Sequence, residues 1–461
     1  MDFSEKLEQA EDLFCDEKYD ESEREFEQLL NENTDEAGAC QIVECWVNCL
    51  MNRYYELQDV NNYEEALILC KKTLDLLNTH ADKFYDKLLC VRNDYALIIG
   101  ELEMYDEAES EYIRLISECR SYYGSKNHDM YIAMGNLAGI YSDTGRIPAA
   151  IAIRSHAING LRELHGKSQS DYIREMINLA FDHEYAGNYT KALALLEQAY
   201  ELRKQKFGMN NAYTIDVIFN IAVYYKRIQQ GEIAVRYFRL AASHIEKDDF
   251  TTLIHKVQYA ICLSWIGEKK QAERIVSKVS DQLPLAEYGV DELKEYMEYA
   301  YSGIALYERN YAEAVLHAEN AVSCIINNSV RKVNAQEYVA EVLFYAGEYK
   351  RAYSILEQIC DHYENTECDV LDLLMYNYVH ANVTAALGMF DKAEKSVFNA
   401  MTISRQCTFA AASFLAYSAI SDTLAKDSSP LNARFLLEIS RLDRRRYDAL
   451  VVCVRLMICL T

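Results

Sequence analysis

The residues best suited to chemistry are two small groups of side chains that could bind a metal. His183 is followed by Glu184, which begins the His-Glu-x-x-His pattern that binds zinc in one class of metalloproteases. The second histidine of that pattern is missing, so we interpret the pair as a solvated polar edge. Cys40, Cys45 and Cys49 place two or three sulfurs near one face of a predicted helix. Because no histidine or fourth cysteine stands at normal zinc spacing, we favour core packing for them.

Other catalytic patterns are absent from the sequence. It contains no Gly-x-x-x-x-Gly-Lys loop for phosphates, no Gly-x-Ser-x-Gly nucleophile elbow and no Gly-x-Gly-x-x-Gly after a predicted strand. We therefore predict no catalytic residues, no cofactor and no metal site, and we expect a protein that is not an enzyme.

The elements that would position any site come from an internal repeat. Gly124, Gly166 and Gly208 lie 42 residues apart, and each is followed by a helical run that carries Asn-Leu-Ala or Asn-Ile-Ala. A pattern repeated at a fixed period of this length predicts a repeat architecture. The three triplets are Asn136-Leu137-Ala138, Asn178-Leu179-Ala180 and Asn220-Ile221-Ala222.

Each copy is predicted to be a helical hairpin. Tyr189, Ala192 and Leu196 lie at helical spacing, which indicates a second helix behind the Gly187-Asn188 turn. The alanine marks a close approach of the two helices, where a larger side chain would push them apart. One hairpin cannot bury its apolar face alone, so the copies must stack into a solenoid. The equivalents of this alanine are Ser22, Ala66, Ala108, Ala150, Ala192, Ala234, Ala272, Ala314, Ala352, Ala393 and Ala433.

These features resemble the tetratricopeptide repeat, which has a small residue in its first helix, a Gly-x-aromatic turn and alanines in its second helix. The resemblance covers nearly the whole chain. It implies an all-α fold, a right-handed α-α superhelical solenoid of about eleven hairpins. The period of 42 residues exceeds the usual ~34. With Gly124 before a first helix, it resembles the kinesin-light-chain subclass, although Asn127-His128-Asp129 stands where that subclass has His-Pro-Asp.

We expect four stretches along the chain. Residues 1–38 form an acidic N-terminal capping hairpin, 39–243 a regular array, 244–405 a second array after a phase change, and 406–461 C-terminal capping helices. The first 36 residues contain 15 acidic and three basic side chains. That density is also compatible with a disordered tail, but helical spacing of the apolar residues favours a hairpin with a polar outer face.

The C-terminal end has a different composition. Four arginines between positions 441 and 446 precede the apolar segment Ala449–Leu460. Membrane anchoring or phosphate binding are the functional interpretations of such a pattern. We favour a final packing helix, because the apolar segment is short and Arg455 interrupts it.

Charge and composition limit the partners. With 47 basic against 72 acidic residues and a pI of about 4.9, the average field repels phosphate, which disfavours nucleic acid. No apolar run approaches the ~20 residues of a membrane helix, and no signal peptide is recognisable. The 14 cysteines show no Cys-x-x-Cys pair and are predicted to be free thiols. We expect a cytoplasmic protein without membrane contact, and its oligomeric state is open.

The resemblance also suggests where a ligand would bind. It implies that first helices line a concave surface. It also implies that the first-helix residue two before the alanine of the Asn-Leu-Ala or Asn-Ile-Ala triplet faces this surface. An amide there can donate to and accept from the backbone of an extended peptide. Tyr185 and Arg227 would assist from nearby positions of the groove. Bonds between the helices of the scaffold are the alternative role, and we favour the ligand. The position is occupied by Asn52, Asp94, Asn136, Asn178, Asn220 and Gln258.

The leading hypothesis for function is a non-enzymatic scaffold that holds an extended peptide or a helix of a partner protein in its groove. A peptide-sensing regulator is the first alternative, but it needs an output domain such as a helix-turn-helix, and residues 1–36 are too acidic to dock on DNA. A host-directed effector or an accessory subunit is the second alternative.

Overall fold

The described residues are helical, with glycine or a few substitutes in the turns between helices. The computed structural model describes residues 3–32, 35–59, 62–167, 170–227, 230–244, 250–283, 290–325, 329–365 and 370–406. These residues form twenty α-helices and no strand. The first nine are α1 (Phe3–Cys15), α2 (Tyr19–Glu32), α3 (Glu36–Asp59), α4 (Tyr63–Thr79), α5 (Ala81–Glu101), α6 (Tyr105–Tyr123), α7 (His128–Asp143), α8 (Ile147–His165) and α9 (Ser170–Tyr185). The others are α10 (Tyr189–Phe207), α11 (Ala212–Arg227), α12 (Gly231–Ala242), α13 (Phe250–Trp265), α14 (Lys269–Gln282), α15 (Val290–Tyr307), α16 (Tyr311–Ser323), α17 (Ser329–Tyr345), α18 (Tyr349–Asn365), α19 (Val370–Ala386) and α20 (Phe390–Gln406).

The turn inside each hairpin explains why glycine recurs there. Gly187 has a φ of 72°, a left-handed conformation that glycine adopts without steric cost. The N–H of Asn188 then donates to the carbonyl of His183 at 2.7 Å, which closes the end of α9. Glu103 and Arg309 hold the same conformation at φ of 61° and 60°, so the hairpin turn is kept even where glycine is absent.

The crowded alanine predicted for every hairpin is confirmed. In the described residues its ten equivalents are all fully buried: Ser22, Ala66, Ala108, Ala150, Ala192, Ala234, Ala272, Ala314, Ala352 and Ala393. In the first hairpin the serine hydroxyl donates to the carbonyl of Ala10 at 2.7 Å, so its polar atom is satisfied. The fold is thus an all-α solenoid of stacked hairpins.

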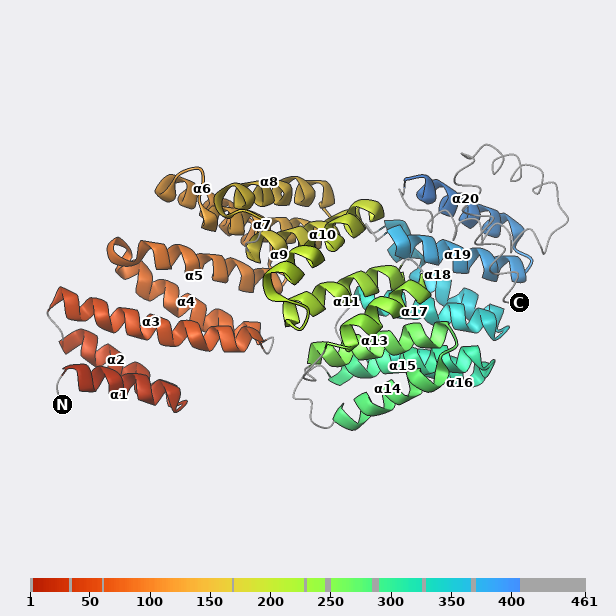
Figure 1. Cartoon of the computed structure of the whole chain (residues 1–461), viewed down its shortest axis with the longest axis horizontal. Helices are drawn as coiled ribbons and strands as arrows, with labels where there is room; N and C mark the ends of the chain where they lie inside the picture. Colours follow the sequence, from red (N-terminus) through yellow and green to blue (C-terminus); the bar gives the residue numbers. More distant parts are fainter. Residues whose placement is uncertain are drawn as a thin grey trace. The chain divides into compact units, whose positions relative to one another are not determined.

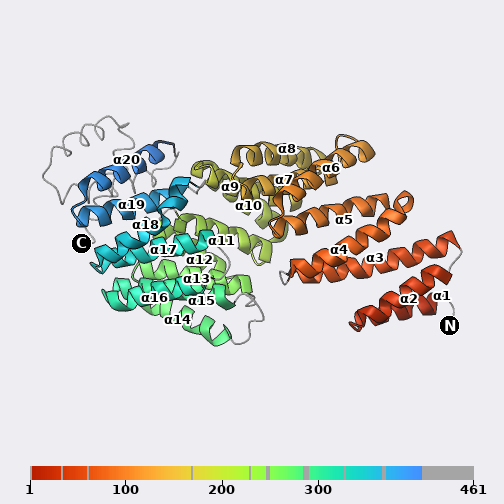
Figure 2. The same cartoon turned by 180° about the vertical axis from the view of Figure 1, so that it is seen from behind.

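The chain divides into two compact units, Met1–Glu175 and Met176–Thr461, and the boundary falls inside α9. In each unit the hairpins follow one another in chain order (Figure 1), as the view from behind also shows (Figure 2). The predicted stretches 1–38, 39–243, 244–405 and 406–461 stay a prediction. Ala433, the arginines at 441–446 and the apolar segment Ala449–Leu460 lie outside the described residues, as does most of the phase change after position 244.

Two further expectations concern the cysteines and the membrane. The ten cysteines in the described part of the chain are free thiols, as predicted. Of the helices described above, none combines the length and the apolar composition needed to span a bilayer.

Candidate functional site

The second unit carries a pocket of about 440 Å³. A volume of this size lies in the range of ligand-binding pockets, about 300–1,000 Å³. Its walls come from five helices, α11, α13, α15, α17 and α19, each of which is the first helix of its hairpin. The lining residues are Val223, Lys226, Arg227, Gln258, Ile261, Trp265, Glu295, Tyr296, Tyr299, Arg331, Asn334, Tyr338, Leu371, Asp372 and Met375.

The pocket holds a lysine without an acidic partner. The ammonium of Lys226 donates to the side-chain oxygen of Gln258 at 3.3 Å, and within the described residues no carboxylate lies in ion-pair distance of it. Burial lowers the pKa of Lys226, and the nearby Arg227 lowers it further. Because an ammonium has three N–H donors, a single bond to an amide leaves hydrogen-bonding capacity for a ligand.

Aromatic rings form another part of the wall. Two cations lie near the ring of Tyr296, with the Lys226 nitrogen 6.0 Å and the Arg331 guanidinium 5.9 Å from its centroid. The rings of Tyr299 and Tyr338 meet edge to face at 5.2 Å. Trp265 at the pocket is 40% exposed. These faces give the pocket apolar area against which a ligand can pack.

The acidic groups of the pocket are tied to scaffold partners. Glu295 accepts a hydrogen bond from Arg331 at 2.6 Å; burial raises the pKa of this carboxyl, and the arginine opposes the shift. Asp372 accepts from the amide of Asn334 at 3.1 Å. The arrangement can bind a ligand that offers carbonyl or carboxylate oxygens and an apolar side chain.

Similarity to known proteins agrees with the fold. Residues 172–247 match the family model of the tetratricopeptide repeat. This stretch of the chain is similar to tetratricopeptide repeats. None of the curated proteins matches it in sequence.

Solved structures extend the likeness over most of the chain. The apo form of the quorum sensor NprR from B. thuringiensis is 16% identical, with a TM-score of 0.52, and covers 78% of this chain and 97% of that chain. The apo form of RapI is 13% identical, with a TM-score of 0.52, over 78% and 98%. Yeast Tom70 is 12% identical, with a TM-score of 0.42, over 95% and 99%. At these identities the likeness is one of fold.

Within the repeats of the second unit, the predicted groove residues have different surroundings. Arg227 lines the pocket, and its guanidinium also donates to Glu184 at 2.6 Å. Glu184 is buried, so the interpretation of His183 and Glu184 as a solvated polar edge is wrong for the glutamate. Asn178 and Asn220 are half-buried, and neither amide has a hydrogen-bond partner among the described residues. Asn220 precedes the pocket residues of its helix by one turn. Tyr185 is 48% exposed.

In the first unit, two of the three residues at the equivalent repeat position, Asp94 and Asn136, bond to neighbouring helices. Asp94 accepts hydrogen bonds from the hydroxyls of Tyr54 and Tyr55, both at 2.7 Å. Burial raises the pKa of Asp94, and these two hydrogen bonds oppose the shift. This joins α5 to α3. Asn52, on α3, is exposed.

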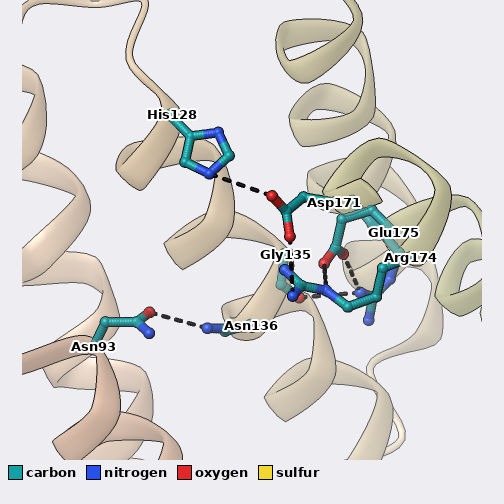
Figure 3. Close-up of polar contacts among 8 residues, drawn as sticks. Asn93, His128, Gly135, Asn136, Asp171, Arg174 and Glu175 are labelled. Carbon is teal, nitrogen blue, oxygen red and sulfur yellow. Dashed lines mark hydrogen bonds and ion pairs between the residues drawn. The ribbon is translucent and has the colours of Figure 1, made fainter. Parts of the chain in front are cut away.

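Asn136 is also engaged with the scaffold. Its amide nitrogen, on α7, donates to the side-chain oxygen of Asn93 on α5 at 2.9 Å (Figure 3). That bond is the inter-helix role that the sequence left open. At this residue, therefore, the amide contributes to stacking, whatever else it binds.

Close to Asn136, the sequence analysis missed a buried ion pair. Arg154 on α8 donates to Glu175 on α9 at 2.7 Å and to the carbonyl of Gly135 at 3.1 Å. The two charged side chains are only 4% and 1% exposed. A methyl group at Gly135 would lie 2.5 Å from the glutamate oxygen, so the glycine makes room for the pair (Figure 3).

Two signals in the repeat could have revealed this pair. Arg154 lies four residues after Ala150, the buried alanine of its own hairpin. Glu175 lies 17 residues before Ala192, the equivalent alanine of the next hairpin. Other repeats have apolar residues at both positions, for example Leu196 and Val217. Two charges placed where other copies are apolar predict a buried pair, because either charge alone would be costly.

Proposed function

We propose that the protein is a non-enzymatic interaction scaffold, and that the pocket of its second unit binds an extended segment of a partner protein. The observation that carries the proposal is the lining of the pocket by five successive first helices. Solenoids of stacked hairpins present such inner surfaces to partners. A partner segment that lies across these helices contacts several repeats at once.

The chemistry of the lining favours a peptide. Lys226 supplies N–H donors to carbonyl or carboxylate oxygens. Gln258 and Asn334 carry amides, which bond to peptide backbone whatever the side chains are. The exposed ring of Trp265 offers an apolar face for one side chain of the segment. The pocket selects a short extended segment with at least one acidic and one apolar group.

The polar residues predicted to line the groove, at one position of each first helix, belong to the same proposal. Asn178 and Asn220 are half-buried and lack protein partners in the described part of the chain, so their donors and acceptors are available to a ligand. Tyr185 and Arg227 are proposed to assist them. In the first unit, Asn52, Asp94 and Asn136 are proposed as contacts, and the last two also bond to the scaffold.

Charge supports a protein partner over nucleic acid. The net charge of −25 opposes binding to a phosphate backbone. A cytoplasmic location without membrane contact remains part of the proposal.

The test uses the intact protein to capture partners from the source cell, followed by mass spectrometry and by binding measurements with peptides of the captured protein. Lys226→Met and Trp265→Ala should each weaken binding tenfold or more. Phe398→Ala is the matched control, because this ring is 61% exposed on α20 and does not line the pocket. Equal affinity of the two pocket variants and the wild type would refute the proposed site.

A peptide-sensing regulator is the second candidate. It is supported by the fold that the chain shares with the quorum sensor NprR. The two candidates differ in what the peptide does to the protein, because a sensor changes conformation when it binds and a scaffold holds its partner without such a change. Small-angle scattering of the full chain with and without the captured peptide separates them.

A further inference from the structure

Three side chains between the first hairpin and the next helix have the chemistry of a metal site. Cys45 and Cys49 lie one turn apart on α3, and Glu11 lies on α1. One ligand atom from each, two sulfurs and a carboxylate oxygen, lie within 4.8 Å of one another. The sequence analysis grouped the two cysteines with Cys40, and nothing in the sequence indicated that a glutamate from another hairpin would meet them.

The surroundings fix two of the ligands and leave the third free to adjust. Cys45 is buried in a cluster that includes Ala10, Phe26 and Trp46, and Cys49 packs against the same cluster. Glu11 directly follows the buried Ala10 on α1, but its own side chain is exposed. The sulfurs therefore stand on a packed surface, and the carboxylate can rotate toward them from the solvent side.

The spacing suits a thiophilic ion. A tetrahedral zinc ion with sulfur bonds of about 2.3 Å holds its sulfur ligands about 3.8 Å apart. Ligand atoms within 4.8 Å reach that spacing by a movement of about 1 Å or less, which side-chain rotation provides. Thiolates and a carboxylate are ligands that zinc accepts.

We propose that Glu11, Cys45 and Cys49 bind a zinc ion or a cation of similar thiophilicity, with the fourth position open to solvent. On binding, the two thiols lose their protons to the solvent and each sulfur donates an electron pair to the cation, so no oxidant or reductant is required.

The consequence of binding is a cross-link between hairpins. α1 belongs to the first described hairpin, and α3 is the first helix of the next one. An ion held by α1 and α3 ties these two neighbouring hairpins together. Because the ion binds the folded protein, it should raise its melting temperature.

The test measures cadmium and zinc binding to the reduced full-length protein. Cadmium serves as the probe because its thiolate bonds absorb in the ultraviolet, and zinc affinity follows from competition with a chelating indicator. The wild type should bind one equivalent more than the double variant Cys45→Ser and Cys49→Ser. The matched control removes Cys15 and Cys40, two thiols of the same helices that lie outside the cluster, and it should bind like the wild type.

A milder variant guards against loss of folding in the cysteine double variant. Glu11→Gln changes an exposed side chain and should keep the melting temperature in chelator while weakening zinc affinity tenfold or more. Glu8→Gln, on the same helix, should leave affinity unchanged. Equal stoichiometry of the wild type and the double variant, or unchanged affinity of Glu11→Gln, would overturn the proposal.

Discussion

The same position of the repeat has different roles in the two units. It bonds to the scaffold in the first unit and lines a pocket in the second. Asp94 and Asn136 lie 14 residues before their alanine markers, as Gln258 and Tyr338 do in later repeats. In the first unit these side chains bond to a neighbouring helix of the scaffold. In the second unit they line a pocket, while each also bonds to a neighbouring first helix, Gln258 to Lys226 and Tyr338 to Ser302.

This difference shows that the repeat determines where a side chain lies but not which group it contacts. The period fixes the face on which a side chain lies, because the backbone of each hairpin is the same. The partner of that side chain is decided by residues in the adjacent repeats, which are free to differ. In the first unit, the hydroxyls of Tyr54 and Tyr55 donate to Asp94. In the second unit, no carboxylate of the described residues lies in ion-pair distance of Lys226. The comparison can be tested from both sides.

The largest effect is expected from Arg154→Met in the first unit. The change leaves the buried Glu175 with only Arg174, whose Nε lies 3.4 Å from its Oε1 and whose side chain is 47% exposed. Loss of the buried partner should lower the free energy of unfolding by about 3 kcal/mol. Urea unfolding followed by circular dichroism measures this. The exposed pair of Lys126 and Glu163 provides the control, and Lys126→Met should change stability by no more than about 1 kcal/mol.

A double variant sharpens that result. Arg154→Leu combined with Glu175→Val installs the side chains that Leu196 and Val217 supply at the same positions of other repeats. It should recover most of the loss, since apolar replacement of a buried ion pair is often neutral. If Arg154→Met is as stable as the Lys126 control, the pair does not stabilise the first unit.

The next effect should be equal in the two units. Ala108→Leu and Ala192→Leu each place a larger side chain at a fully buried helix approach and should destabilise by about 1–3 kcal/mol through overpacking. Thermal melts of both variants give the comparison. A neutral result in either unit would mean that the repeat register is relaxed there.

Smaller effects should separate the two roles of the amide. Asn136→Ala removes a bond to Asn93 and should cost about 1 kcal/mol of stability. Asn178→Ala and Asn220→Ala should stay within about 0.5 kcal/mol, yet weaken binding of the captured peptide. Melting curves and peptide titrations of the three variants are the measurement. Early melting of the last two would assign them to the scaffold as well.

The smallest effect is a pH dependence in the second unit. Burial raises the pKa of Glu341 on α17 to about 7, although a hydrogen bond with Tyr345 opposes the shift. A carboxyl whose pKa is higher in the folded state stabilises the fold at low pH, and this stability is lost as the pH rises through about 7. The melting temperature should fall as the pH rises from about 4.5 to about 7 and change little above that. Glu341→Gln should flatten the curve, whereas Glu313→Gln, at an exposed site on α16, should not.

The sequence predicted the scaffold better than the site, for a physical reason. Ala192 and its equivalents report a contact inside their own hairpin, so their period alone predicts their burial. The pocket depends on contacts between hairpins, such as Lys226 with Gln258, which join residues 32 positions apart. The sequence pattern identified Gln258 at the same repeat position as Asn136, and Arg227 as a residue of the groove. Tyr296 and Arg331 were missed, because no repeat position marks them.

The five-helix lining of the pocket has a consequence for local opening of the chain. In a solenoid each hairpin contacts only its neighbours, so one can open while distant ones stay closed. A ligand that touches α11, α13, α15, α17 and α19 together makes the opening of each depend on release of the same molecule. Amide hydrogen exchange in these five helices should then slow in step when the pocket is filled, so that repeats which open separately without ligand exchange as one cooperative segment.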